Sequence, residues 1–181
     1  GDDLRHLDWP LYWRQQQTFI KVSDSREDCP INIVTDVTAS MGVDGKALLA
    51  CRLAAALGFV GVESGNSVHL YEVNSLVSRV CTAAERSGFL HQFCERINAL
   101  EFVNSGDVSE GLLKLPHLVR HQGITIVISD FLDTQQLPQA LSLMASKSDT
   151  VLLHIIGDWE NSPVLEQSQM LKDIETGEQV T

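Results

Sequence analysis

Hydrophobic positions along the chain fall into short, nearly continuous runs, separated by longer stretches with a helical period. Three of these runs are rich in β-branched residues: Ile31–Asp36, Ile124–Asp130 and Asp149–Ile156. Such runs are typical of parallel strands whose two faces are both covered by helices. We therefore expect these three segments to form the centre of a parallel sheet.

The stretches between these strands place apolar residues three or four positions apart, as helices do. Lys46–Glu63 is apolar on nearly every face, which predicts a helix buried on more than one side. Pro116 is expected to kink or end the helix that begins at Val108, because proline cannot donate a backbone hydrogen bond. The predicted helices are Lys46–Glu63, Ser87–Ala99, Val108–Leu115 and Thr134–Lys147.

Two more strand candidates, Ser67–Val73 and Val77–Cys81, are joined by Asn74 and Ser75, which predicts a tight hairpin. One antiparallel edge strand then joins an otherwise parallel sheet. Strands that alternate with helices over long crossovers predict an α/β, doubly wound, mostly parallel sheet with helices on both faces.

The two ends of the chain differ in character from its middle. The first segment, 1–29, is rich in charges and holds Trp9, Tyr12 and Trp13, which we expect to pack on the side of the sheet, with an exposed partner site as the alternative. The α/β domain is predicted over 30–160. Residues 161–181 are expected to be a carboxyl-terminal tail, and the absence of an initial Met favours a chain cut from a longer protein.

Charge and composition narrow the classes of partner. The chain has 13 basic and 24 acidic residues and a net charge of −11, which repels nucleic acid and anionic membrane surfaces. The most apolar run, Ala47–Val62, is short and contains Arg52, so no transmembrane span is expected. With no signal peptide visible, we expect a cytoplasmic domain, and a membrane anchor upstream in the parent protein is left open.

Oxygen-bearing side chains gather where the predicted central strands end. Asp36 and Asp130 each end such a strand, and Thr38 and Ser40 follow Asp36 at alternate positions. Ligands of doubly wound sheets bind beyond the carboxyl ends of the strands, and carboxylate and hydroxyl oxygens suit Mg²⁺. The alternative is structural, since the same residue types cap helices and satisfy loop N–H groups.

Two known patterns match these residues. The segment Asp36–Gly42 resembles the D-x-S-x-S loop of the metal-ion-dependent adhesion site in von Willebrand factor type A domains, and Ile128–Asp130 resembles that site's later strand-end aspartate. The segment Gly1–Trp9 resembles the G-D-D-x-R-x-I-D-W signature of a bacterial family catalogued as domain of unknown function fifty-eight. The tail Leu171–Glu178 is also similar to that family.

The resemblance implies a von Willebrand factor A-like fold and a Mg²⁺ site held by a small set of oxygen ligands. The family site draws a further hydroxyl from a threonine, but Gly106 stands at that position here, so the site is partly degenerate. Ser105, one residue away, could substitute if the loop shifts. Gly106→Thr is expected to raise metal affinity unless the backbone needs a positive φ there. The expected ligands are Asp36, Thr38, Ser40 and Asp130, with Ser105 as the further candidate.

The resemblance also implies a function. Relatives commonly accompany MoxR-type AAA+ ATPases, which implies a non-enzymatic protein-interaction module that serves as an adaptor in protein assembly or maturation. The second hypothesis is a Mg²⁺-dependent phosphohydrolase with Asp36 as nucleophile, similar to haloacid dehalogenase-like enzymes. Those enzymes need a carboxylate two residues later, where this chain has Thr38.

Overall fold

A five-stranded sheet forms the centre of the protein in the computed structural model, which describes residues 29–83, 89–102, 106–119, 123–132, 136–162, 171–172 and 179–180. The strand order is β3-β2-β1-β4-β5, with β2 and β3 antiparallel and the other neighbours parallel. The strands are β1 (Ile31–Asp36), β2 (Val68–Val73), β3 (Val77–Ala83), β4 (Ile124–Ser129) and β5 (Asp149–His154). A separate pair joins β6 (Leu171–Lys172) to β7 (Gln179–Val180).

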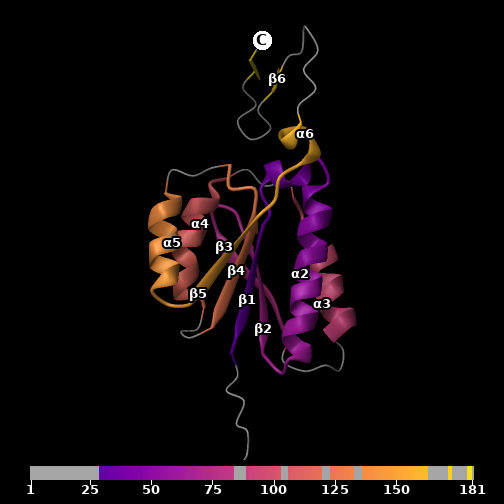
Figure 1. Ribbon diagram of the computed structural model, residues 1–181, viewed down its shortest axis with the longest axis vertical. Helices are drawn as coiled ribbons and strands as arrows, with labels where there is room; N and C mark the ends of the chain where they lie inside the picture. The colour runs from indigo at the N-terminus through magenta and orange to yellow at the C-terminus, as the bar shows by residue number, and fades with distance from the viewer. Residues whose placement is uncertain are drawn as a thin grey trace, which may run out of the picture.

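Helices cover both faces of the sheet (Figure 1). On one face lie α2 (Lys46–Glu63) and α3 (Phe89–Asn98), and on the other lie α4 (Val108–Lys114) and α5 (Leu137–Ala145). Ile33 packs in the core cluster that includes α2 and α3 residues, whereas its neighbour Val34 packs in the cluster that includes α4 and α5 residues. Both faces of β1 are therefore buried, and the predicted doubly wound α/β architecture with its antiparallel edge strand is confirmed.

The direction of the strand order reverses at β1. This strand pairs with β2 on one side and with β4 on the other, both in parallel. Asp36 is the last residue of β1, and Asp130 directly follows the last residue of β4. Because parallel strands end at the same edge of a sheet, the topology brings the two aspartates to one edge at the point where doubly wound sheets bind ligands.

The position of β5 corrects one expectation. Its apolar run predicted a central strand covered on both faces, but β5 is the last strand of the sheet order. Val151 and Leu152 are 43% and 40% exposed, and His154 is exposed as well. An apolar run indicates a strand, but the run alone does not distinguish a central strand from an edge strand.

The packing of α2 differs in part from the expected burial on more than one side. Small residues on one side of the helix are buried against the sheet: Ala50, Ala54, Gly58 and Gly61. A Cβ at Gly61 would lie 2.7 Å from a methyl of Val68, so the absence of a side chain at Gly61 permits this close approach. The larger side chains Leu48, Leu49, Phe59 and Val60 are 43–61% exposed instead. The helix is thus buried on its small-residue side and also packs against α3, whereas these larger side chains leave its remaining side exposed.

Local boundaries follow the expected chemistry with small shifts. The α4 helix ends at Lys114 and continues as a 3-10 turn, η3 (Leu115–His117), which contains Pro116. The hairpin between β2 and β3 has three connecting residues rather than two, and the Asn74 side chain accepts a hydrogen bond from Leu76 N at 2.8 Å. The first residues of two predicted helices, Ser87 and Thr134, lie outside the described residues. The aromatic residues Trp9, Tyr12 and Trp13 do as well.

No helix within the described parts of the chain combines the length and the apolar character needed to cross a bilayer.

Two short elements complete the edge of the sheet near the two aspartates. They are the 3-10 turn η2 (Ala39–Gly42) and the helix α6 (Asp158–Asn161), which lies beside the amino-terminal end of α2 (Figure 1).

Candidate functional site

Asp36 is the hydrogen-bonding centre of the site. Its carboxylate is 1% exposed and accepts three hydrogen bonds. Oδ1 accepts from Thr38 N at 2.8 Å and from Thr38 Oγ1 at 2.7 Å, and Oδ2 accepts from Ser129 Oγ at 2.5 Å. The first two bonds fold the chain back immediately after β1, and the third joins the end of β1 to the end of β4. Asp36 is therefore fixed by its own loop and by the neighbouring strand.

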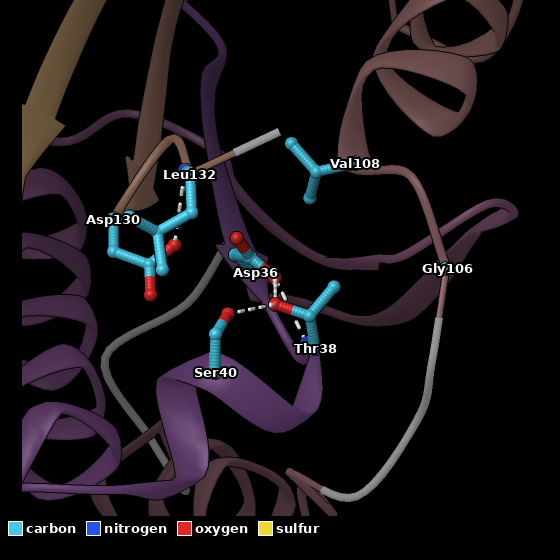
Figure 2. Close-up of a pocket in the computed structure, with 7 residues that line it drawn as sticks. All are labelled: Asp36, Thr38, Ser40, Gly106, Val108, Asp130 and Leu132. Carbon is cyan, nitrogen blue, oxygen red and sulfur yellow. Dashed lines mark hydrogen bonds between the residues drawn. The ribbon is translucent and has the colours of Figure 1, made fainter. Parts of the chain in front are cut away.

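Thr38 and Ser40 extend this network. The Thr38 and Ser40 hydroxyl oxygens lie 3.0 Å apart, and η2 begins directly after Thr38. A hydroxyl has one hydrogen to donate, and Thr38 Oγ1 uses it in the hydrogen bond to Asp36. Ser40 Oγ is therefore the donor in the hydrogen bond between the two hydroxyls. Both residues are 3% exposed. Figure 2 shows their oxygens facing the space beside the Asp36 carboxylate, so the alternate positions found in the sequence do converge.

A cavity of about 10 Å³ lies among these side chains. This volume matches the space that one water molecule or one small ion needs. The lining residues are Asp36, Thr38, Ser40, Gly106, Val108, Asp130 and Leu132 (Figure 2).

The surroundings of Asp36 raise its pKa from 3.8 to about 6. Burial is the largest cause and the charge of Asp130 adds to it, while the hydrogen bonds from Ser129 and Thr38 act in the opposite direction. A cation in the cavity would lower it again, because a nearby positive charge favours the carboxylate.

Lys46, which the sequence analysis did not identify, completes the site. Its side chain is 1% exposed, and its Nζ lies 2.7 Å from Asp130 Oδ2 and 2.6 Å from Glu160 Oε1. Burial alone lowers the pKa of Lys46, but the hydrogen bonds and charges of Asp130 and Glu160 outweigh burial, so the pKa is raised. The hydrogen bond from Lys46 in turn lowers the pKa of Glu160.

A signal for Lys46 was present in the sequence. It is the first residue of α2, where the helix dipole disfavours a cation, so a lysine there needs an acidic partner. The preceding residues Asp44 and Gly45 have φ values of 54° and 74°, and this left-handed turn leads into the helix. Sequence alone does not reveal the partners, because Asp130 and Glu160 lie 84 and 114 residues away.

Gly106 lies on the other side of Asp36 from Asp130 in the close-up view (Figure 2). Its φ is 152°, and a Cβ there would collide with Ser75 Oγ and lie 3.0 Å from Ser75 N. The condition attached to the Gly106→Thr expectation is therefore met, and a threonine at this position requires the loop to shift. Ser105, the substitute hydroxyl, lies outside the described residues.

The donor set fits one hard divalent cation. A carboxylate, two hydroxyls and a second carboxylate surround a space of the size of one ion, and Mg²⁺ retains water at its other positions. No group of three or more His, Cys, Asp or Glu residues that could hold a metal exists among the described residues. An ion at this edge would need the hydroxyls of Thr38 and Ser40, and Asp130 is already paired with Lys46.

The parallel β2-β1-β4-β5 order, the antiparallel β3 and the oxygen cluster at the ends of β1 and β4 define a von Willebrand factor A-like α/β domain. The chain belongs to the family described as protein of unknown function DUF58, whose model matches residues 1–181. The uncharacterized protein Rv1480 of Mycobacterium tuberculosis is 22% identical over 163 residues, which cover 86% of this chain and 51% of that protein. The chain therefore spans about half the length of the curated relatives it matches.

Solved structures share the fold at low sequence identity. A von Willebrand factor type A structure from Catenulispora acidiphila aligns with a TM-score of 0.52 and 13% identity over 70% of this chain and 33% of that chain. The conserved hypothetical protein BatB from Bacteroides thetaiotaomicron aligns with a TM-score of 0.54 and 12% identity, over 70% of this chain and 66% of that chain. An aerotolerance-related membrane protein from Bacteroides fragilis aligns with a TM-score of 0.56 and 14% identity, over 84% of this chain and 80% of that chain. At these identities the likeness concerns the fold.

Proposed function

We propose that this domain is a non-enzymatic protein-interaction module that binds its partner at the sheet edge formed by Asp36, Thr38, Ser40 and Asp130. The observation that carries the proposal is the convergence of these side chains around a space for a single ion, at the strand ends where α/β sheets bind ligands. Loops held by a rigid sheet are common binding surfaces. Mg²⁺ at this position would supply a coordination site for a carboxylate of the partner.

The surface around the edge supports the same function. Leu132 lines the cavity and is 63% exposed, while Ile156 and Trp159 are 53% and 48% exposed. Trp159 belongs to α6, and its backbone N donates to Asp44 Oδ2 at 2.7 Å. Exposed large apolar side chains that lie near polar groups are typical of protein-interaction surfaces.

The partner we propose is a MoxR-type AAA+ ATPase, with this chain as the adaptor for assembly or maturation of client proteins. Family resemblance is the basis for this partner. An ATP-dependent partner places this domain in the cytoplasm, where ATP is available.

Titration of the full-length protein with a MoxR-type ATPase from the same organism tests the proposal. Asp36→Ala and Asp130→Ala should each weaken binding at least tenfold, about 1.4 kcal/mol, while the fold is retained by circular dichroism. Asp149→Ala is the matched control, because Asp149 is an exposed carboxylate at the start of β5, on the sheet edge opposite to the one that holds Asp36 and Asp130. Wild-type binding by both edge variants, with loss of binding in Trp9→Ala, would move the interface to the amino-terminal segment.

The phosphohydrolase alternative has less support. Thr38 takes the place of the required carboxylate, and its hydroxyl proton is donated to Asp36. The cavity among these side chains, about 10 Å³, has the size of a single ion or water molecule. We expect no turnover of a generic aryl phosphate with Mg²⁺, and turnover that disappears in Asp36→Asn would reinstate an enzyme.

A further inference from the structure

Lys46 occupies an unusual position for a lysine. Its ammonium is buried at the amino-terminal end of α2 and bridges two carboxylates from distant parts of the chain, Asp130 after β4 and Glu160 in α6. Lysine is almost never fully buried unless it is paired. The bridge places a positive charge beside the cavity, at the carboxylate that a bound ion would share.

We infer that Lys46 is a built-in cation of this site: its ammonium competes with a divalent cation for Asp130 and thereby sets the metal affinity of the edge. The inference deepens the proposed function and rests on the metal-assisted part of it. The competing states are a paired Asp130 with Lys46 in place, and a metal-bound edge in which Asp130 turns toward the ion.

Charge balance supports the competition. With Asp36, Asp130 and Glu160 ionised and Lys46 protonated, the cluster has a net charge of −2. A divalent cation would neutralise it, but the ion would lie close to the Lys46 ammonium, and the two positive charges repel. A neutral side chain at position 46 removes this repulsion and leaves Asp130 free.

Glu160 provides the second half of the mechanism. Its Oε1 lies 2.6 Å from Lys46 Nζ, and its Oε2 accepts a hydrogen bond from Gly157 N at 3.0 Å, so α6 holds the carboxylate in place. When Asp130 turns to the ion, Lys46 keeps Glu160 as its partner, and no bare buried charge is left. Glu160 therefore lowers the free-energy cost of metal binding, and replacing Glu160 should lower the metal affinity.

Mn²⁺ titration by calorimetry, with thermal melting as a second readout, tests these opposite effects. Lys46→Met should bind Mn²⁺ at least about tenfold more tightly than wild type, and Glu160→Gln should bind it about threefold more weakly. Lys147→Met is the matched control and should bind like wild type, since Lys147 contacts Pro116 O away from the edge. Each variant removes one charge, and a purely structural role of Lys46 would not give opposite effects for Lys46→Met and Glu160→Gln.

Each outcome decides the inference. A folded Lys46→Met that binds Mn²⁺ no more tightly than wild type overturns it, as does Glu160→Gln with unchanged affinity. If Lys46→Met does not fold, Glu160→Gln decides alone, because Glu160 is 29% exposed and its replacement leaves the core intact. Absence of Mn²⁺ binding in every variant also overturns the competition, whereas the proposed partner binding stands or falls on the separate ATPase titration.

Discussion

Ser129 Oγ donates a hydrogen bond to Asp36 Oδ2 at 2.5 Å and accepts one from Phe131 N at 2.9 Å. One hydroxyl thus joins the end of β1 to the turn after β4, where Phe131 has a φ of 49°. The site depends on this link between neighbouring strands, because Asp36 and Asp130 arise from different parts of the chain and are positioned by the sheet.

Loss of this hydroxyl should destabilise the edge. Ser129→Ala leaves the Phe131 N–H without its acceptor and removes one hydrogen bond from a buried carboxylate. We expect a loss of about 1–3 kcal/mol in the free energy of unfolding, measured by urea denaturation. Ser146→Ala, at an exposed serine that bonds only Leu143 O, is the control and should cost less than about 0.5 kcal/mol. Equal costs in the two variants would contradict the proposed role of Ser129.

The raised pKa of Asp36 predicts a pH dependence of stability. Its folded-state pKa of about 6 lies above its ordinary 3.8, so the folded state binds the proton more tightly. The stabilisation is present below about pH 4 and is lost as the pH rises through 6. The full shift corresponds to about 3 kcal/mol.

Asp36→Asn tests this dependence, because asparagine resembles the protonated acid. In metal-free buffer its free energy of unfolding should exceed that of wild type by an amount that grows between pH 4 and 7 and then stays constant. Asp149→Asn, at an exposed position, should show no such trend. A difference between Asp36→Asn and wild type that does not change with pH would exclude a raised pKa at Asp36.

The Thr38 hydroxyl should be required for both stability and metal binding. Thr38→Val keeps the shape but removes the hydroxyl that donates to Asp36 Oδ1 and accepts from Ser40 Oγ, while the backbone N–H of residue 38 still donates to Oδ1, so we expect a loss of about 1 kcal/mol and no detectable Mn²⁺ binding. Thr38→Ser retains the hydroxyl and should preserve Mn²⁺ binding. Similar Mn²⁺ affinities for the two variants would show that Thr38 is not a ligand.

Threonine at Gly106 should destabilise the protein rather than complete the site. The φ of 152° and the collision of a Cβ with Ser75 Oγ force the loop to move. We expect Gly106→Thr to cost about 1–3 kcal/mol of unfolding free energy without tighter Mn²⁺ binding. Gly65→Ala, at a positive φ with open space around the Cβ, separates the backbone strain from the collision and should cost less. Tighter Mn²⁺ binding by Gly106→Thr would show that the loop can shift and that the missing hydroxyl limits the site.

Wild-type protein should bind Mg²⁺ weakly, because Lys46 already neutralises Asp130. A dissociation constant of about 1 mM with about 10 mM Mg²⁺ would stabilise the fold by about 1.4 kcal/mol. For a domain of this size the melting temperature should rise by about 3–5 °C. Thermal melting with and without Mg²⁺ measures the shift, and Asp36→Ala should abolish it. An equal shift in Asp36→Ala would place the ion elsewhere.

Hydrophobic periodicity determined the strand and helix segments of the domain. Ile31–Asp36 and Lys46–Glu63 were predicted with the bounds that the structure gives, because a run of β-branched residues and an apolar 18-residue stretch each suit only one kind of secondary structure. The same pattern did not reveal that Leu48 and Phe59 of α2 are exposed or that β5 is an edge strand. Burial depends on which neighbours an element receives, and a local pattern does not contain that information.

The sequence by itself determined the candidate ligands Asp36, Thr38, Ser40 and Asp130, because strand ends and alternate oxygen positions are local features. Only the tertiary structure decided that Asp130 is already paired with Lys46, and that a side chain at Gly106 would meet Ser75. The reason is physical: both contacts join residues that only the folding of the sheet and its crossover helices brings together. The charge within the site is set by these long-range contacts.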